Sequence, residues 1–342
     1  MPYYFSLPII TQLTNNQQMA LDETSAIALG GGPGTGKSVV CLWRHIRNYA
    51  TGTKRSLLLT YTKTLEHYLK QSASTQNAES ATNINRTLWW TSHLNLHQRY
   101  DEIIIDEGQD VFIDRYEIIK NHSDSISYGA DEFQSLYLNK EQLTELFGWF
   151  RQNFDNEEYT LIKNFRNSKE ILEFTRSVFP NILIPQNAIN QAITTNLKPI
   201  VKIIGRDDER ELESIMSIID DFAGDTHNIG ILVPSQNMVN SYYERINNKL
   251  NGRKECSKFQ AEMGDFQGLS GIHITTYKSA KGTEFDTVIM PRFDSFDWFI
   301  ANTDSTSEND YYVAFTRTKT NLFLICNNNP NKGNANTFDI ER

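Results

Sequence analysis

The sequence predicts an α/β protein of two domains, each a mostly parallel sheet flanked by helices. Three observations favour this class. The chain has 342 residues, enough for two hydrophobic cores. Short apolar runs typical of buried strands alternate along it with stretches of helical period. A glycine-rich segment joins the first of these strands to a helix. We place the domains at residues 1–150 and 151–342.

The glycine-rich segment, residues 31–38, reads Gly-Gly-Pro-Gly-Thr-Gly-Lys-Ser and fits the pattern G-x-x-x-x-G-K-[ST]. Glycines let backbone N–H groups turn toward a phosphate, and the start of the following helix favours an anion. Lys37 is expected to reach the β- and γ-phosphates of a nucleoside triphosphate, and the Ser38 hydroxyl to bind Mg²⁺. The residues expected to hold the nucleotide here are Gly34, Thr35, Gly36, Lys37 and Ser38.

An isoleucine run at 103–105 predicts a buried strand that brings Asp106 and Glu107 to its C-terminal end. Asp106 is expected to hold Mg²⁺, and Glu107 to activate an attacking water. Acidic pairs after apolar runs are common in loops. Because this pair follows a phosphate loop, we interpret it as the second part of the same nucleotide site.

The remaining elements continue the alternation of strands and helices. In the first half we expect strands at 56–62 and at 88–93, and another within 124–134 that ends in a polar sensor. In the second half we expect them at 159–162, 199–204, 230–233, 272–277, 287–290 and 322–325. Residues 181–198 are expected to form a loop, and the Asn-rich tail from Asn327 to be frayed.

Composition argues against a membrane protein, a secreted protein and a uniformly basic nucleic-acid binder. No apolar run approaches the ~20 residues of a membrane helix, and the N-terminus lacks the pattern of a secretory signal. Cys41, Cys256 and Cys326 fit no disulfide or zinc pattern, so we expect a cytoplasmic protein with no membrane association. A net charge of −9 argues against a uniformly basic nucleic-acid binder but permits a local binding groove.

Four segments, in this order, resemble superfamily 1 helicases of the UvrD/Rep type. They are the phosphate loop, 105–110 (IDEGQD), 278–286 (KSAKGTEFD) and 312–319 (YVAFTRTK). The resemblance extends over about residues 13–325. It implies two RecA-like P-loop NTPase domains and hydrolysis of ATP with Mg²⁺ between them, coupled to 3′→5′ movement on single-stranded DNA.

The resemblance also implies roles for individual residues. At the nucleotide these are Gln17 for adenine, Gln134 for sensing the γ-phosphate, Phe165 for stacking on adenine, Glu284 for the ribose, Gly282 as a further nucleotide-binding residue, and Arg166 and Arg317 as arginine fingers. Contacts to single-stranded nucleic acid are implied for Tyr61, Thr91, His93, Thr276 and Ser279. For Tyr61 and His93, ordinary packing and capping explain the residues equally well.

The sequence also departs from this family. The stretches 38–106 and 166–275 are short for the accessory domains that larger relatives insert there. Asn139 stands where an aromatic residue usually stacks on a base, and Lys278 and Thr283 replace a usual histidine and leucine. The predicted ATPase residues are therefore nearly complete, whereas the parts that separate strands are reduced.

Three functions fit these patterns. The first is a translocase or helicase on single-stranded DNA, with RNA not distinguished, and the full motif set favours it. The second is a regulatory ATPase subunit that gates a partner, such as a nuclease in phage defence or DNA repair. The short insertions, Asn139 and the net negative charge favour this second function. A small-molecule kinase is the third, and Arg166 and Arg317 in a second strand–helix domain argue against it.

Overall fold

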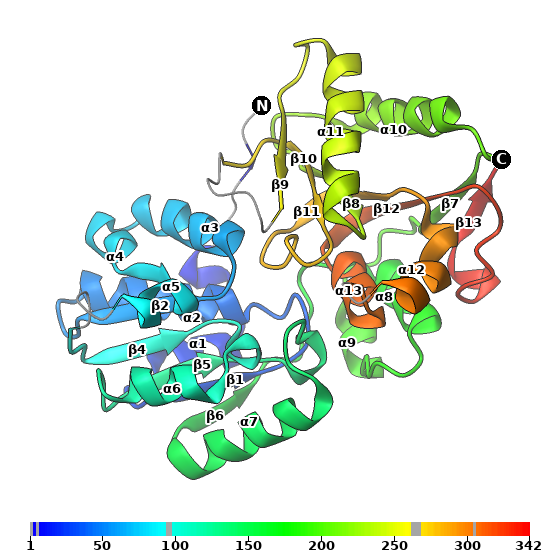
Figure 1. Ribbon diagram of the computed structural model, residues 1–342. Helices are drawn as coiled ribbons and strands as arrows, with labels where there is room; N and C mark the ends of the chain where they lie inside the picture. The colour runs from blue at the N-terminus through cyan, green and yellow to red at the C-terminus, as the bar shows by residue number, and fades with distance from the viewer. Residues whose placement is uncertain (1–2, 5–6, 94–97, 261–267, 304–305) are drawn as a thin grey trace. The chain divides into compact units, whose positions relative to one another are not determined.

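The computed structural model describes residues 3–4, 7–93, 98–260, 268–303 and 306–342. By its internal packing the chain forms two compact units (Figure 1). The first unit is Phe5–Lys163, and the second unit is Met1–Tyr4 together with Asn164–Arg342. Each is described by itself below.

The first unit is built on a parallel sheet whose described strands run in the order β3-β2-β4-β5-β1-β6. These strands are β1 Ile27–Gly30, β2 Ser56–Thr60, β3 Ile84–Arg86, β4 Glu102–Ile105, β5 Ile126–Gly129 and β6 Glu157–Thr160. The helices are α1 Asn15–Asp22, α2 Lys37–Ala50, α3 Lys63–Ser74, α4 Ala78–Thr82, α5 Thr87–Ser92, α6 Ile113–Lys120 and α7 Lys140–Asn153.

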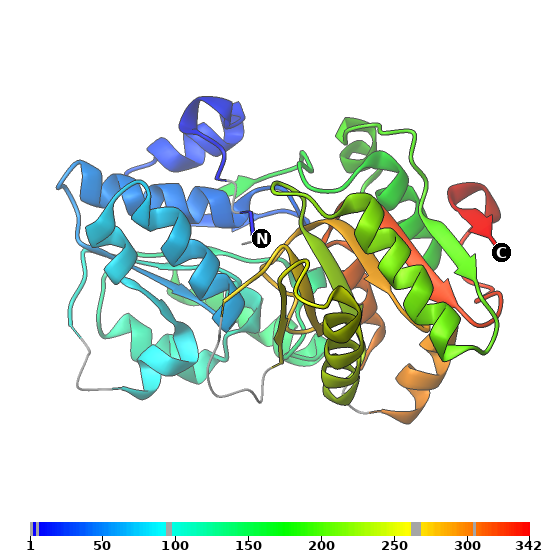
Figure 2. The same cartoon turned by 90° about the horizontal axis from the view of Figure 1, so that it is seen from above.

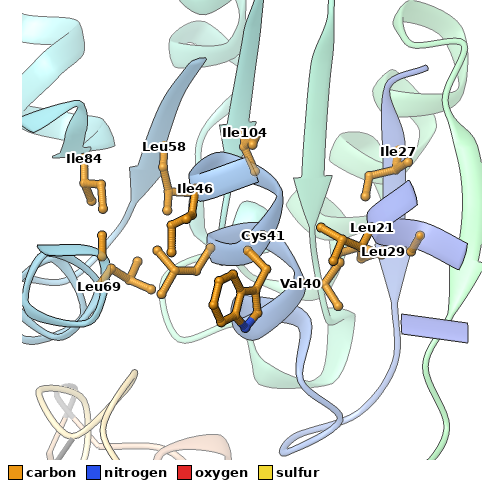
Figure 3. Packing of buried hydrophobic residues seen from close by; sticks show 14 of the residues in the cluster. Leu21, Ile27, Leu29, Val40, Cys41, Ile46, Leu58, Leu69, Ile84 and Ile104 are labelled. Atoms are coloured by element: carbon orange, nitrogen blue, oxygen red, sulfur yellow. The ribbon is translucent and has the colours of Figure 1, made fainter. Parts of the chain in front are cut away.

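The central strands of this sheet are buried on both faces, which is why they read as continuous apolar runs. Successive side chains point to opposite faces of a strand, so each run supplies two cores. Leu58 and Ile104 belong to the core under α2 and α3, whereas Leu57 and Ile103 belong to the core under α6 and α7. Figure 3 shows the first of these cores, where Ile46 of α2 lies close to Leu58.

The predicted strand at 88–93 is wrong, because helix α5 includes residues 88–92 and His93 follows its last residue. The strand at this position is β3, which ends at Arg86 before the helix begins. Trp90 is buried while Leu88 is exposed, as expected for one face of a short helix. A brief run of apolar residues fits a strand or a buried helix equally well, so the pattern alone could not decide.

The strand predicted at 159–162 also differs from the structure. It corresponds to β6, which pairs with β1 at the edge of the first unit's sheet, although we expected it in the second domain. Asn156 fixes the start of β6 through hydrogen bonds from its side-chain amide to the carbonyl oxygens of Ile27 (3.1 Å) and Ile126 (2.9 Å).

The second unit has its own parallel sheet, with described strands in the order β13-β7-β12-β11-β8-β10-β9. They are β7 Ile200–Ile203, β8 Ile229–Val233, β9 Cys256–Phe259, β10 Ile272–Thr276, β11 Phe285–Met290, β12 Thr318–Cys326 and β13 Asp339–Glu341. The helices are α8 Lys169–Val178, α9 Gln186–Gln191, α10 Asp208–Phe222, α11 Gln236–Leu250, α12 Phe296–Asn302 and α13 Glu308–Phe315.

Helices cover both faces of this second sheet. α10 and α11 lie on one face, which Figure 2 views from above, and α8, α12 and α13 lie on the other (Figure 1). The core under α10 and α11 takes its strand residues mainly from β8, β10 and β12. Within the described ranges, no helix of either unit has the length and apolar character needed to cross a lipid bilayer.

Two predictions for the second unit are wrong. Residues 186–191, expected in a loop, form the short helix α9. The tail, expected to be frayed, ends in β13, which pairs in parallel with β7. The β13 side chains are exposed, so the strand forms through backbone pairing, and Phe338 anchors it by packing edge-on against Phe174. Exposed edge strands leave no hydrophobic pattern in the sequence.

Tyr3 and Tyr4, which we term the N-terminal strap, bind to the second unit. The backbone N–H of Tyr3 donates to the carbonyl oxygen of Leu269 (3.2 Å). The Tyr3 hydroxyl donates to the carbonyl oxygen of Glu284 and accepts from its N–H. The side chain of Asn228 bonds both the N–H and the carbonyl oxygen of Tyr4, each at 2.9 Å. The chain therefore passes between the two units twice.

Candidate functional site

Three strands at the centre of the first unit end side by side. β4, β5 and β1 are parallel neighbours, so their C-terminal ends share one edge of the sheet. β1 leads into the phosphate loop, β4 leads into Asp106 and Glu107, and β5 leads toward Asp131. This is the edge at which open parallel sheets bind ligands.

The phosphate loop has a shape that needs glycine. Gly31, Gly34 and Gly36 have φ angles of +133°, +68° and +90°. A Cβ atom at Gly31 would lie 2.2 Å from the carbonyl oxygen of Leu161, and one at Gly36 would lie 2.4 Å from Nε2 of Gln17. Gly36 is also the residue before α2 and has no side chain to cap the helix. The first N–H groups of α2 can therefore bind an anion such as a phosphate.

Gly36→Ala is expected to lower nucleotide affinity by at least about tenfold, because alanine disfavours this backbone and its Cβ would displace Gln17. Titration with a fluorescent ADP analogue would measure this, with thermal denaturation as a check on folding. Gly52→Ala is the matched control, because Gly52 also has a positive φ (+63°) but nothing within 4 Å of its added Cβ. Equal affinity in the two variants would contradict the prediction.

Gln17 lies against the phosphate loop and is buried. Its Nε2 donates to the carbonyl oxygen of Thr35 (3.0 Å), and its Oε1 accepts from the N–H of Thr14 (2.8 Å) in a capping box at the start of α1. In this structure both ends of the amide thus support α1 and the loop. Contact with adenine remains a prediction from the resemblance.

Lys37 is mostly buried, and its ammonium lies close to backbone carbonyl oxygens and a carboxylate oxygen of the first unit. Nζ donates to the carbonyl oxygens of Gly31 (2.6 Å) and Gly32 (3.0 Å) and lies 3.7 Å from Oδ2 of Asp131. These partners hold the ammonium beside the phosphate loop, in a position to bind a phosphate there.

Asp106 is buried, and this burial together with the nearby charge of Glu107 raises the pKa of its carboxyl group from 3.8 to about 7. The Ser38 hydroxyl and the Lys37 ammonium act in the opposite direction. Oδ1 accepts from the N–H of Glu107 (3.1 Å), whereas Oδ2 is buried with no hydrogen-bond partner among the described residues. A bare carboxylate oxygen near a hydroxyl is a donor set that suits Mg²⁺, so Asp106 and Ser38 fit this ion.

Asp106→Asn is expected to stabilise the metal-free protein, and more so at higher pH. A folded-state pKa near 7 means that wild-type stability falls as pH rises from about 4 to about 7, since the folded protein must lose a proton that the unfolded chain has already released. Melting temperatures in EDTA should therefore show a gain that grows from pH 5 to pH 8. Asp225→Asn, at an exposed carboxylate, controls for loss of one charge. A gain that does not change with pH would refute this expectation.

A chain of hydrogen bonds joins Glu107 to Gln134. Gln109 Nε2 donates to Glu107 Oε2 (2.6 Å), and Gln109 Oε1 accepts from the N–H of Asp131 (3.0 Å). Gln134 Nε2 then donates to Asp131 Oδ2 (2.5 Å). All four side chains are buried. The structure thus connects the predicted water-activating residue to the predicted γ-phosphate sensor.

Glu107 also has an unusual backbone, with φ of +58°. A non-glycine residue in this left-handed region costs about 1–3 kcal/mol and is found mainly where surrounding structure holds it. Together with the Gln109 bond, this turn fixes the direction of the Glu107 side chain.

The sequence analysis missed Gln109 and Asp131. Gln109 lies within 105–110, a segment that carries the resemblance, and Asp131 lies three residues before Gln134, but their bond links residues 22 positions apart. The sequence shows these two residues, but their contact depends on β4 and β5 being neighbours in the sheet.

In the second unit the strand register gathers another group of predicted residues. β11 and β12 pair Phe285 with Thr318, and the N–H of Phe285 donates to the carbonyl oxygen of Arg317 (2.9 Å). Glu284 and Arg317 therefore lie at the same edge of this sheet. Arg166 joins them, with Nε 3.1 Å from Oε2 of Glu284.

The other predicted nucleotide residues of the second unit differ in exposure. Arg317 is buried, and its guanidinium donates to the carbonyl oxygen of Val313 (3.0 Å) and the Thr316 hydroxyl (3.2 Å). Phe165 is exposed, as a ring that stacks on a base would need to be. Gly282 has φ of +87° in the turn before β11.

The nucleic-acid candidates of the first unit have different surroundings. Tyr61 is half-buried after β2, and its ring lies 4.5 Å from that of Tyr137, centre to centre. The Thr91 hydroxyl is buried and donates to the carbonyl oxygen of Thr87 within α5 (2.8 Å). His93 is exposed and stacks on Trp89 at 4.3 Å. Tyr137, which the sequence analysis missed, thus joins Tyr61 as an aromatic pair.

Thr276 and Ser279 lie together in the second unit. Thr276 is the last residue of β10, and its hydroxyl accepts from the N–H of Ser279 (3.2 Å). Both residues are mostly buried.

Asn139, in the first unit, caps α7: its side chain accepts from the N–H of Gln142 (2.9 Å).

Comparison with protein-family models and with curated proteins found no match. Among solved structures, S. cerevisiae Dbp5 bound to RNA and ADP BeF3 has a TM-score of 0.59 at 11% identity, over 94% of this chain and 85% of that one. An arterivirus helicase, nonstructural protein 10, has a TM-score of 0.47 at 12% identity, over 91% of this chain and 61% of that one. The C-terminal domain of a possible DNA helicase from Lactobacillus plantarum has a TM-score of 0.38 at 14% identity, over 52% and 99%. The likeness to Dbp5 shows the fold: the chain consists of two RecA-like α/β domains, each a parallel sheet flanked by helices.

Proposed function

We propose that this protein is an ATP-dependent translocase or helicase of the UvrD/Rep type that moves 3′→5′ on single-stranded DNA. One observation carries the proposal: the buried chain from Glu107 to Gln134 lies beside Lys37 and Asp106 at the binding edge of a RecA-like sheet. The fold shared with Dbp5, which was solved with RNA and ADP BeF3, supports it. Direction and DNA come from the motif resemblance.

The first unit supplies the residues that would hold and hydrolyse ATP. The phosphate loop and Lys37 bind the triphosphate, and Asp106 with Ser38 holds Mg²⁺, which neutralises phosphate charge when bound. Glu107 accepts the proton of the attacking water. Gln134 senses the γ-phosphate and transmits its presence through Asp131 and Gln109.

The second unit supplies Arg166 and Arg317 as cations that stabilise charge on the phosphates during transfer. Phe165 stacks on adenine, Glu284 binds the ribose, and Gly282 is a further nucleotide-binding residue. Since Arg166 is paired with Glu284 in this structure, it must exchange that partner for phosphate during the cycle.

Single-stranded DNA is proposed to bind both units. Tyr61 and Tyr137 provide ring faces for bases, and Thr276 and Ser279 provide groups for phosphate oxygens. Because Asn139 serves as a helix cap, it does not replace the stacking aromatic of larger relatives.

The deciding experiment is steady-state ATP hydrolysis with and without single-stranded DNA or RNA, followed by unwinding of duplexes with a 3′ or a 5′ tail. Strong stimulation by DNA and a requirement for the 3′ tail would support the proposal. Stimulation by RNA alone would overturn the choice of DNA. Hydrolysis indifferent to both would favour an ATPase subunit that gates a protein partner, and an absence of hydrolysis would exclude an autonomous motor.

A further inference from the structure

Glu284 carries two cations, one on each carboxylate oxygen. Its Oε2 lies 3.1 Å from Nε of Arg166, and its Oε1 lies 3.0 Å from Nζ of Lys319. Lys319 also lies 3.7 Å from Oδ1 of Asp286. Burial alone would raise the pKa of the Glu284 carboxyl group, but Lys319 and Arg166 outweigh it and hold the pKa at about 2. The carboxylate is therefore charged throughout the physiological pH range.

The strand register places Lys319 near Glu284. Thr318, just before Lys319, pairs with Phe285, just after Glu284, at the start of β11 and β12. The Tyr3 hydroxyl holds the backbone of Glu284 from both its N–H and its carbonyl oxygen. Arg166, in contrast, lies in the segment between β6 and α8 and reaches the carboxylate from outside the sheet.

Among the described residues, the Arg166 side chain has one weak contact besides Glu284. Its Nη1 lies 3.5 Å from the carbonyl oxygen of Thr316, at the limit of a hydrogen bond, and its side chain is 18% exposed. If Arg166 leaves, Glu284 would lose one of its two cations. Leaving a partly buried carboxylate without a cation costs free energy, so Arg166 can leave more easily when the second cation stays.

We propose that Lys319 is a positioning residue that controls the availability of Arg166. Because Lys319 keeps its ion pair with Glu284, that carboxylate attracts Arg166 less strongly. Lys319 also neutralises the Glu284 charge once Arg166 has moved to the phosphate. This inference rests on the proposed role of Arg166 as an arginine finger. It assigns no contact between Lys319 and the nucleotide.

The proposal makes a specific kinetic prediction. Lys319→Met should leave Glu284 with Arg166 as its main cation, so kcat should fall about fivefold at saturating ATP while KM changes little. Lys319→Arg should restore kcat. In the double variant Lys319→Met with Glu284→Gln, kcat should rise again, because the neutral amide no longer retains Arg166, even if a lost ribose contact raises KM. A double variant as slow as Lys319→Met or slower would overturn the proposal.

A second measurement needs no hydrolysis and so separates this proposal from the proposed function. Phenylglyoxal modifies free guanidinium groups, and peptide mass spectrometry can follow Arg166 in nucleotide-free protein. Modification of Arg166 should be several-fold slower in Lys319→Met than in wild type, and faster in Glu284→Gln. Equal rates in wild type and Lys319→Met would overturn the proposal even if the protein proves to be an active ATPase. If wild type does not hydrolyse ATP, the same rates still decide whether Lys319 acts on Arg166.

Lys202 offers a matched control for both measurements. Its ammonium pairs with Glu341 at 2.9 Å, and its side chain is 24% exposed, against 3.0 Å and 22% for Lys319 with Glu284. Lys202→Met thus removes a similar ion pair between β7 and β13, and it should alter neither kcat nor the modification of Arg166. Melting temperatures of all variants would show whether any loss of activity reflects unfolding.

Discussion

Glu107→Gln is expected to reduce the rate of ATP hydrolysis by about 10²–10⁴-fold, because the amide cannot accept a proton from the attacking water. The substitution keeps the size of the side chain and its bond from Gln109. Nucleotide binding should therefore persist. Phosphate release under saturating ATP measures the first effect, and titration with a fluorescent ADP analogue measures the second.

The matched control for this variant is Glu132→Gln. Glu132 is an exposed carboxylate between Asp131 and Gln134, so its substitution removes the same charge without altering the buried hydrogen-bond chain. Hydrolysis by Glu107→Gln within a few-fold of wild type would show that another group activates the water, and the assignment of Glu107 would have to be withdrawn.

Arg166→Ala is expected to lower kcat by about 10³–10⁵-fold, the range seen when an arginine finger is removed. Because Glu284 keeps Lys319 at 3.0 Å, the variant should fold with little loss of stability. Arg166→Lys should recover only part of the rate, since an ammonium lacks the planar fork of the guanidinium. Single-turnover hydrolysis, together with melting temperatures, would test this.

Arg176→Ala is a suitable comparison, because Arg176 lies on α8 in the same unit and its guanidinium donates to the exposed Gln186 side chain (2.6 Å). Comparable loss of activity in both variants would point to a general electrostatic effect. A full rate in Arg166→Ala would leave Arg317 as the finger to test next, and would remove the basis for the role given to Lys319.

The strands that build the candidate site were predictable because their burial is recorded in their composition. Ile103 to Ile105 are buried on both faces of the first sheet, and no polar residue interrupts them. The phosphate loop was predictable for a different reason: its φ angles exclude side chains, so glycine marks it. Both signals are local and can be read from a few neighbouring residues.

The parts that could not be predicted depend on distant partners. The bond between Gln109 and Asp131 requires β4 and β5 to be adjacent, and β13 forms from exposed residues with no apolar pattern. The ion pairs of Glu284 depend on the register of β11 and β12 and on Arg166, which lies 118 residues earlier. Single-sequence patterns carry no information about such pairings.

The N-terminal strap has a consequence for the order of folding during synthesis. Tyr3 and Tyr4 are synthesised before the rest of the described chain, but their partners Glu284 and Asn228 lie 281 and 224 residues later. The first unit is complete once Lys163 has emerged, so it can fold while the strap is still unattached. The second unit must then bind the N-terminal strap, which is synthesised long before the strands of its sheet. Of the two units, it is expected to mature later, and attachment of the strap closes a loop that spans 281 residues.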